Sequence, residues 1–155
     1  MKRTNAIKER LNGHRKLLEK LATMQAELEY LRNPGPKVPK LSHTPRGGGL
    51  PGDPVAEATA QIIELEARMA QKREEIEADW TELEPFVGQL QPMETLVINL
   101  RYMHGAEWPQ INRIIYGKAD DYEVEIDRYL NKTFKIHGRA LLTLSEIWPT
   151  SVSIP

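Results

Sequence analysis

The sequence predicts an all-α protein in which a long two-helix, coiled-coil-like arm precedes a small C-terminal helix-turn-helix domain. Three observations support this prediction: two stretches with apolar residues at heptad spacing, a proline- and glycine-rich segment between them, and shorter amphipathic stretches separated by glycines in the last third. The predicted segments are an N-terminal helix at 1–32, a flexible linker at 33–53, a second arm helix at 54–84, the helix-turn-helix domain at 85–148 and a tail at 149–155.

The two arm helices are predicted from this spacing and from the prolines that bound them. Pro34 ends the first helix, Pro54 begins the second and Pro85 ends it. Residues 33–54 hold six of the eleven prolines and five of the ten glycines, so we expect a mobile, extended connection. The predicted inward positions are Ile7, Arg10, His14, Leu17, Leu21, Met24, Leu28 and Leu31 in the first helix, and Val55, Ala58, Ile62, Leu65, Met69, Lys72, Ile76, Trp80 and Leu83 in the second.

Charge is distributed unevenly along the chain, although the net charge is only -1. Residues 1–46 carry eleven Lys and Arg against four Asp and Glu, and residues 47–84 carry three against ten. This complementarity predicts that the two arm helices pack on each other, within one chain or across a dimer. The alternative is that both helices simply expose solvated, salt-bridged faces. Because a two-helix seam is thin for a monomer, we expect a homodimer or a higher homo-oligomer.

The sequence lacks the residues that several classes of function require. It contains no cysteine, which excludes disulfides, thiol nucleophiles and thiolate metal sites. The four histidines are scattered, and no phosphate loop or nucleophile–base motif is present. No apolar run approaches the ~20 residues of a membrane span. We therefore expect no enzyme activity, no cofactor or metal, and no membrane partner.

The C-terminal part is predicted to hold three helices. The first begins at Gln91 with a proline in its first turn, and Gly105 takes the left-handed conformation that ends it. The second spans residues 108–116 and ends at Gly117. The third is capped by Asp120 or Asp121 and runs to Pro149. The apolar positions expected to face inward are Leu96, Val97, Leu100 and Met103 in the first helix, and Ile111, Ile114 and Ile115 in the second.

The last helix is predicted to have one apolar and one cationic face. A helix packed by one face and cationic on the other can lie in the major groove of DNA, where Arg and Lys reach phosphates and guanine edges. An ordinary solvated face is the alternative, and the near-neutral domain favours it. The predicted apolar face comprises Ile126, Leu130, Phe134, His137, Leu141, Leu144 and Trp148, and the cationic face comprises Arg128, Lys132, Lys135 and Arg139.

A family resemblance supports the DNA-binding interpretation. It rests on Leu90-x-Pro92-x-Glu94, Leu96-Val97-Ile98, Leu100-Arg101-Tyr102, Gly105, Trp108-x-x-Ile111 and Arg139-Ala140-Leu141-x-x-Leu144. This pattern over residues 90–147 resembles region four of sigma factors and, more closely, phage and prophage late-gene regulators of the ArpU/RinA type.

The resemblance implies a sequence-specific regulator that binds double-stranded DNA and activates phage late or packaging genes in the cytoplasm of a bacterial host. RNA polymerase is a further partner by analogy alone. A dimer would read two half-sites about one helical turn apart, or a multiple of that. The residues predicted to contact DNA are Arg113, Lys118, Arg128, Lys132, Thr133, Lys135, His137 and Arg139.

Some of these assignments compete with structural roles. Thr133 is as well suited to core packing as to a phosphate or a thymine methyl group, and His137 faces the apolar side of the helix wheel. The stretch from Gly117 to Asn131 departs from the sigma pattern and is acidic, so we expect the DNA contacts late, from Lys132 to Arg139. The rival function is a helical interaction or assembly factor that does not bind nucleic acid.

Overall fold

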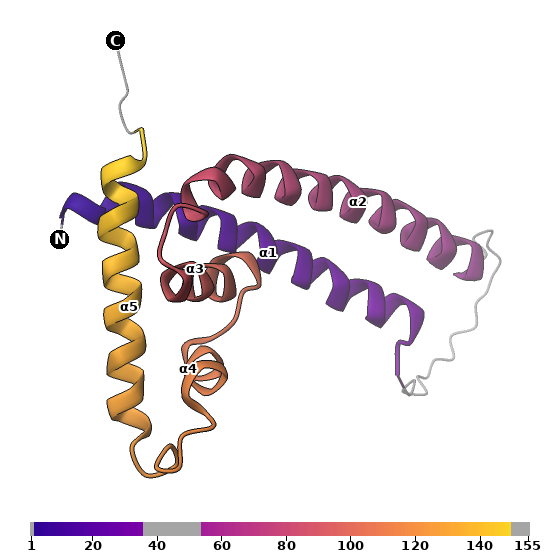
Figure 1. Ribbon diagram of the computed structural model, residues 1–155. Coiled ribbons are helices and arrows are strands. Elements are labelled where there is room, and N and C mark those ends of the chain that lie inside the picture. The colour runs from indigo at the N-terminus through magenta and orange to yellow at the C-terminus, as the bar shows by residue number, and fades with distance from the viewer. Residues whose placement is uncertain (1, 36–53, 150–155) are drawn as a thin grey trace. The chain divides into compact units, whose positions relative to one another are not determined.

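The structure is a computed structural model that describes residues 2–35 and 54–149. Most of the predicted linker and tail therefore lie outside the described residues. The described part contains helices and no strand, which confirms the all-α prediction. In chain order (Figure 1), the elements are η1 (Lys2–Thr4), α1 (Asn5–Arg32), α2 (Pro54–Val87), α3 (Pro92–Ile98), η2 (Asn99–Met103), α4 (Trp108–Tyr116) and α5 (Ile126–Ile147).

The chain divides into two compact units, and both arm helices contribute to each of them. The first unit comprises Met1–Glu19 and Ile76–Pro155, and the second comprises Lys20–Glu75. The predicted division at residue 84 differs from this one, because the first turns of α1 and the last turns of α2 belong to the C-terminal unit.

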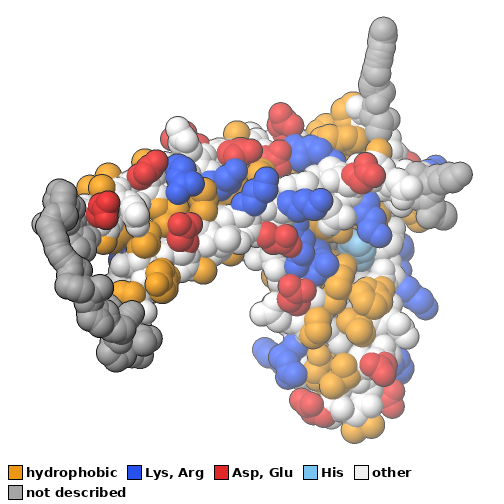
Figure 2. All heavy atoms as spheres, turned by 180° about the vertical axis from the view of Figure 1, so that it is seen from behind, with side chains coloured by type: hydrophobic (Ala, Val, Ile, Leu, Met, Phe, Trp, Pro, Cys, Tyr) orange, Lys and Arg blue, Asp and Glu red, His pale blue; other side chains and the backbone are white. Residues whose placement is uncertain are grey.

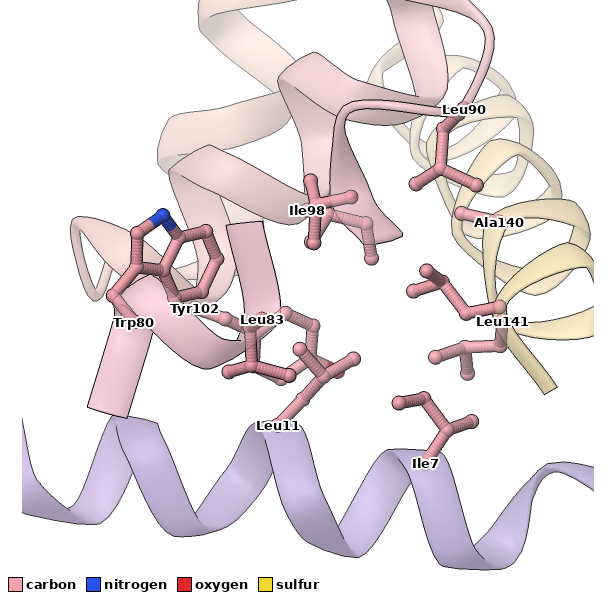
Figure 3. Packing of buried hydrophobic residues seen from close by; sticks show 11 residues of the cluster. Ile7, Leu11, Trp80, Leu83, Leu90, Ile98, Tyr102, Ala140 and Leu141 are labelled. Atoms are coloured by element: carbon pink, nitrogen blue, oxygen red, sulfur yellow. The ribbon is translucent and has the colours of Figure 1, made fainter. Parts of the chain in front are cut away.

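The larger of two buried hydrophobic clusters joins the helices of the first unit. Figure 3 shows side chains of α1, α2, α5 and the α3 segment meeting at this point. Burial of this much apolar surface explains why the first turns of α1, the end of α2 and α5 fold as one unit. The buried members of the core are Ile7, Leu11, Trp80, Leu83, Val87, Leu90, Ile98, Tyr102, Ala140, Leu141 and Leu144.

The beginning of α1 packs with a register that differs from the predicted one. Leu11, which follows Ile7 by four residues, is fully buried where the prediction placed Arg10. The Arg10 guanidinium instead lies at the edge of the core and donates hydrogen bonds of 3.0 Å to Asp79 Oδ2 and to Glu82 Oε1. Within this unit, basic α1 therefore pairs with acidic α2, as charge complementarity predicted, and it does so within one chain, which the sequence left open.

The second unit is built from the remaining parts of the same two helices. Leu65 and Met69 of α2 are buried there, and Arg32 hydrogen-bonds to Glu66. The prediction that Val55 faces inward is wrong, because its side chain is 72% exposed. Lys72 Nζ lies 2.9 Å from Glu75 Oε1 on the same helix.

The end of α2 corrects the prediction that Pro85 terminates this helix. The helix continues to Val87, because Val87 is buried in the core and Phe86 packs edge-on against Trp148 with ring centroids 4.9 Å apart. Pro85 lies in the last turn, where its missing N–H removes only one hydrogen bond of the helix.

The starts of α3 and α4 follow from local sequence. Gln91 caps α3 in a capping box with Glu94, and Glu107 caps α4 in the same way with Gln110. The backbone continues from α3 into η2, a π-helical turn that ends at Met103 and has His104 as its C-cap. Gly105 follows with φ of 71°, which confirms the predicted left-handed turn.

The start of α5 does not follow the prediction that Asp120 or Asp121 caps it. The helix begins at Ile126 after Glu125, and a series of turns occupies residues 117–124. Buried Tyr122 anchors these turns, and its ring stacks on that of Tyr129 with centroids 6.0 Å apart. The acidic stretch is thus a separate segment in front of the last helix.

Across the described ranges, no helix combines the length and apolar character needed to cross a membrane.

Candidate nucleic-acid interface

The exposed face of α5 carries the predicted cations. At 100° per residue, Arg128, Lys132, Lys135 and Arg139 fall opposite the buried residues, and all four are exposed. Their order along one face places them where a nucleic-acid backbone can approach. The buried face consists of Tyr129, Thr133, Ile136, His137, Ala140, Leu141 and Leu144.

Thr133, one of the predicted DNA contacts, is completely buried. Its hydroxyl lies 3.0 Å from Asn112 Oδ1 and 3.2 Å from the backbone oxygen of Tyr129. The Asn112 amide in turn donates to the backbone oxygen of Ile126 over 3.2 Å. This buried network joins α4 to α5, so Thr133 belongs to the core and not to the cationic face.

His137 is likewise buried and lies in an aromatic cluster. Its Nε2 is 2.7 Å from the Tyr102 hydroxyl, and its ring meets Trp108 edge-on with centroids 4.8 Å apart. Burial, with the nearby charges of Lys8 and Arg101, lowers the pKa of His137 to about 4. Burial also raises the pKa of Tyr102 to about 12, against the opposing influence of Arg101 and Arg15. His137 is therefore a neutral core residue at neutral pH, as the helix wheel indicated.

The N-terminal cation of the row, Arg128, is held by the protein's own carboxylates. Its Nη2 lies 3.2 Å from Asp121 Oδ2, and its Nε lies 3.6 Å from Glu125 Oε1. The Tyr129 hydroxyl donates to Asp121 Oδ1 over 2.6 Å. This hydrogen bond, supported by the charges of Arg128 and Lys132, lowers the pKa of Asp121. The same bond raises the pKa of Tyr129.

The remaining cations of the row are less neutralised. Lys132 lies over the rings of Tyr129 and Tyr116, with its Nζ 5.3 Å and 6.0 Å from the two centroids. Within the described ranges, Lys135 has no carboxylate within salt-bridge distance. Arg139 has one, Glu94, whose Oε2 is 3.8 Å from its Nε. That carboxylate also accepts from the Gln91 N–H in the capping box, so it neutralises Arg139 only in part.

Two predicted contacts lie outside α5. Arg113 of α4 is exposed, lies over the Tyr122 ring at 5.5 Å, and has Glu123 Oε2 at 3.8 Å. Lys118 is exposed in the turns after α4. Neither side chain belongs to the α5 row. Arg113 is paired with the acidic segment, and Lys118 lies within it.

The N-terminus adds residues to this region that sequence reasoning assigned to the arm. η1 packs against α5, and Arg3 Nη2 lies 3.8 Å from Glu146 Oε2. Lys8 is exposed, and its charge acts on His137. The spacing of Ile7 and Leu11, both buried beside α5 residues, is the sequence signal that this part of α1 belongs to the C-terminal unit.

Five apolar positions of the C-terminal helices depart from the predicted inward orientation, and Leu96 and Met103 of the first predicted helix are two of them. Ile114 is 58% exposed, and Ile126 and Phe134 are also exposed. Phe134 covers Trp108 edge-on with centroids 5.1 Å apart. Trp108 therefore packs against α5, and the Arg101 guanidinium lies 4.6 Å from its ring centroid.

The charged surface is mixed where the space-filling view displays it: Lys and Arg side chains alternate with Asp and Glu in Figure 2. The open end of the α5 row, from Lys132 to Arg139, supplies three cations at helical spacing. Such a row can bind phosphates and, with Arg139, the two acceptors of a guanine edge.

No protein-family model, no curated protein and no solved structure matches the chain.

Proposed function

We propose that this protein is a sequence-specific regulator that binds double-stranded DNA through the exposed cations of α5. In this proposal it belongs with the phage and prophage late-gene regulators that its sequence resembles, and it activates late or packaging genes. RNA polymerase is a partner in the same proposal, by analogy with sigma region four.

The observation that carries the proposal is the contrast between the two faces of α5. One face is anchored by buried apolar residues and by the Thr133–Asn112 and Tyr102–His137 hydrogen bonds. This anchoring gives the opposite face a fixed direction, so its cations are presented on a rigid element and not on a loop. Lys135 is the least neutralised of them.

In the proposed mode, Lys132 and Lys135 contact phosphates and position the protein, and Arg139 reaches a base edge or a further phosphate. The acidic turns at 117–125 lie outside the contact, because their carboxylates repel phosphate. A homodimer places two such helices on half-sites separated by about one helical turn of DNA.

Titration of the full chain with fragments of the genome that encodes it, at several salt concentrations, tests this proposal. The logarithm of the binding constant should fall steeply and linearly with the logarithm of salt concentration. Lys135→Ala should weaken binding and reduce this slope by about 1, as expected for one lost phosphate contact. Arg73→Ala, which removes an exposed cation from α2, is the matched control and should leave both quantities unchanged.

The second candidate function is a helical interaction or assembly factor. Val124, which follows Glu123 in the chain, is 83% exposed, and Ile114 of α4 is also exposed; these apolar side chains favour a protein partner. This function takes precedence if salt does not alter DNA binding, or if Lys135→Ala and Arg73→Ala behave alike.

A further inference from the structure

A second polar site lies outside the cationic face, around His14 of α1. The His14 side chain is 99% buried, since only 1% of it is exposed, and its Nδ1 lies 2.8 Å from Asp79 Oδ2. Its other ring nitrogen, Nε2, is buried and has no hydrogen-bond partner among the described residues. An unpaired buried polar atom destabilises the folded state, so this nitrogen requires an explanation.

The hydrogen bond to Asp79 determines what His14 Nε2 can bind. A carboxylate only accepts hydrogen bonds, so Nδ1 of His14 carries the proton that lies between them. In the neutral ring Nε2 then carries a lone pair and is an acceptor. Arg10 also binds Asp79, with its Nη1 3.0 Å from Asp79 Oδ2, and this second contact fixes the carboxylate that orients the ring.

The His14 ring forms part of the lining of a cavity of about 360 Å³ in the first unit. Glu77 and Glu84, one turn either side of Thr81 on α2, bring two carboxylates to the same cavity. Trp80 and Met103 supply an aromatic ring and a thioether, and the Trp80 ring lies 5.0 Å from the His14 ring. The cavity thus combines the His14 nitrogen and two carboxylates with an apolar, polarisable wall, and Thr81 and His104 complete its polar lining.

We propose that this cavity binds the head group of an organic cation, an alkylammonium or alkylguanidinium. The cation donates hydrogen bonds to His14 Nε2 and to the carboxylates of Glu77 and Glu84, and its apolar stem packs on Trp80 and Met103. An anion would meet the carboxylates of Glu77 and Glu84, which repel it. A metal ion does not suit the site, because no group of three His, Asp or Glu residues within the described ranges is placed to coordinate one.

The proposal does not depend on DNA binding, since none of its residues belongs to the α5 row. The head group has two sources, a free amine or a lysine side chain of another protein. n-Butylammonium represents the first source, and Nα-acetyl-lysine methylamide represents the second. Tighter binding of one of these probes assigns the source, and binding of either supports the site.

The test is an NMR titration of the full chain, at constant ionic strength, that follows the His14 ring nitrogens and the Trp80 indole. n-Butylammonium should shift both signals saturably, and neutral n-butanol at the same concentrations should not. The double variant Glu77→Gln/Glu84→Gln should bind at least about tenfold more weakly, because it keeps the shape and removes both charges. Glu64→Gln/Glu74→Gln removes two exposed carboxylates of α2 elsewhere and is the matched control.

If His14→Phe folds, n-butylammonium should no longer shift the Trp80 indole signal of this variant. If His14→Phe does not fold, the affinity of Glu77→Gln/Glu84→Gln tests the proposal. Equal shifts by butanol, or equal affinity of the two double variants, would overturn the proposal. So would a response of His14 to Zn²⁺ without any response to either ammonium probe.

Discussion

The two halves of α5 carry the same kind of cation in different surroundings. In the N-terminal half, Arg128 is bound by Asp121 and Glu125, and Tyr129 completes the cluster. In the C-terminal half, Lys135 has no such partner within the described ranges, and Arg139 shares Glu94 with a helix cap. The position of a cation on an exposed face therefore does not decide its availability, because local carboxylates neutralise one end of the row and leave the other open.

The largest expected effect comes from His137, a buried residue that anchors the C-terminal half of α5. Its pKa of about 4 lies below the ordinary value of about 6.5, so between these values the unfolded chain binds a proton that the folded chain does not. The free energy of unfolding should therefore fall by about 3 kcal/mol from His137 alone as the pH drops from 6.5 to 4, and this contribution should then level off.

Urea unfolding across this pH range measures the effect. His137→Gln removes the titration and keeps a group that can hydrogen-bond to Tyr102, so its stability should vary less with pH. His104→Gln, at an exposed histidine, is the control and should keep the slope of the unaltered protein. An unchanged slope in His137→Gln would show that the buried ring is not the group that titrates.

The second prediction compares the two ends of the cationic row directly. Arg139→Ala should weaken binding to the DNA target by about 1–3 kcal/mol if Arg139 contacts a base. Arg128→Ala should have a much smaller effect, because its guanidinium is already engaged by carboxylates. Both variants remove an arginine from the same helix face, so gel shifts at fixed salt measure the difference. Equal losses would mean that the Asp121 cluster opens when DNA binds.

Variants of Thr133 distinguish a role in the core from a role in DNA binding. Thr133→Val should lower the free energy of unfolding by about 1–3 kcal/mol, because Asn112 Oδ1 loses its hydroxyl partner in a buried place. Thr133→Ser keeps the hydroxyl and should recover that part of the loss. DNA affinity of the folded protein should be the same for both variants, and a selective loss of affinity in Thr133→Val would return this residue to the interface.

Much of the fold could be predicted from the sequence because the arm and the short helices are amphipathic with regular spacing and clear boundaries. Gln91 with Pro92 and Glu94, and Gly105 in its left-handed turn, are local signals that the structure confirms. The contact of Ile7 and Leu11 with the C-terminal unit is not local, and heptad spacing alone could not distinguish a continuous arm from one shared by two units.

The candidate site was predictable in part for a related reason. The helix wheel predicted which cations of α5 are exposed, since charged side chains rarely lie in a core. It could not show that Thr133 is buried, because a polar side chain is stabilised there by one specific partner, Asn112, from another helix. The same holds for the capture of Arg128, which depends on how the acidic turns fold back onto α5.

The smallest expected effect comes from releasing Arg128. Asp121→Asn removes the charge that Arg128 and Tyr129 share, so it should free a cation and raise DNA affinity by about twofold, a change on the scale of one exposed ion pair. Asp120→Asn removes one exposed carboxylate from the same turns without touching the Arg128 cluster, and it serves as the matched control for net charge. An equal gain in both variants would assign the effect to the overall charge of the acidic segment. A gain in Asp121→Asn alone, lost again in the double variant with Arg128→Ala, would show that this carboxylate restrains the N-terminal end of the row.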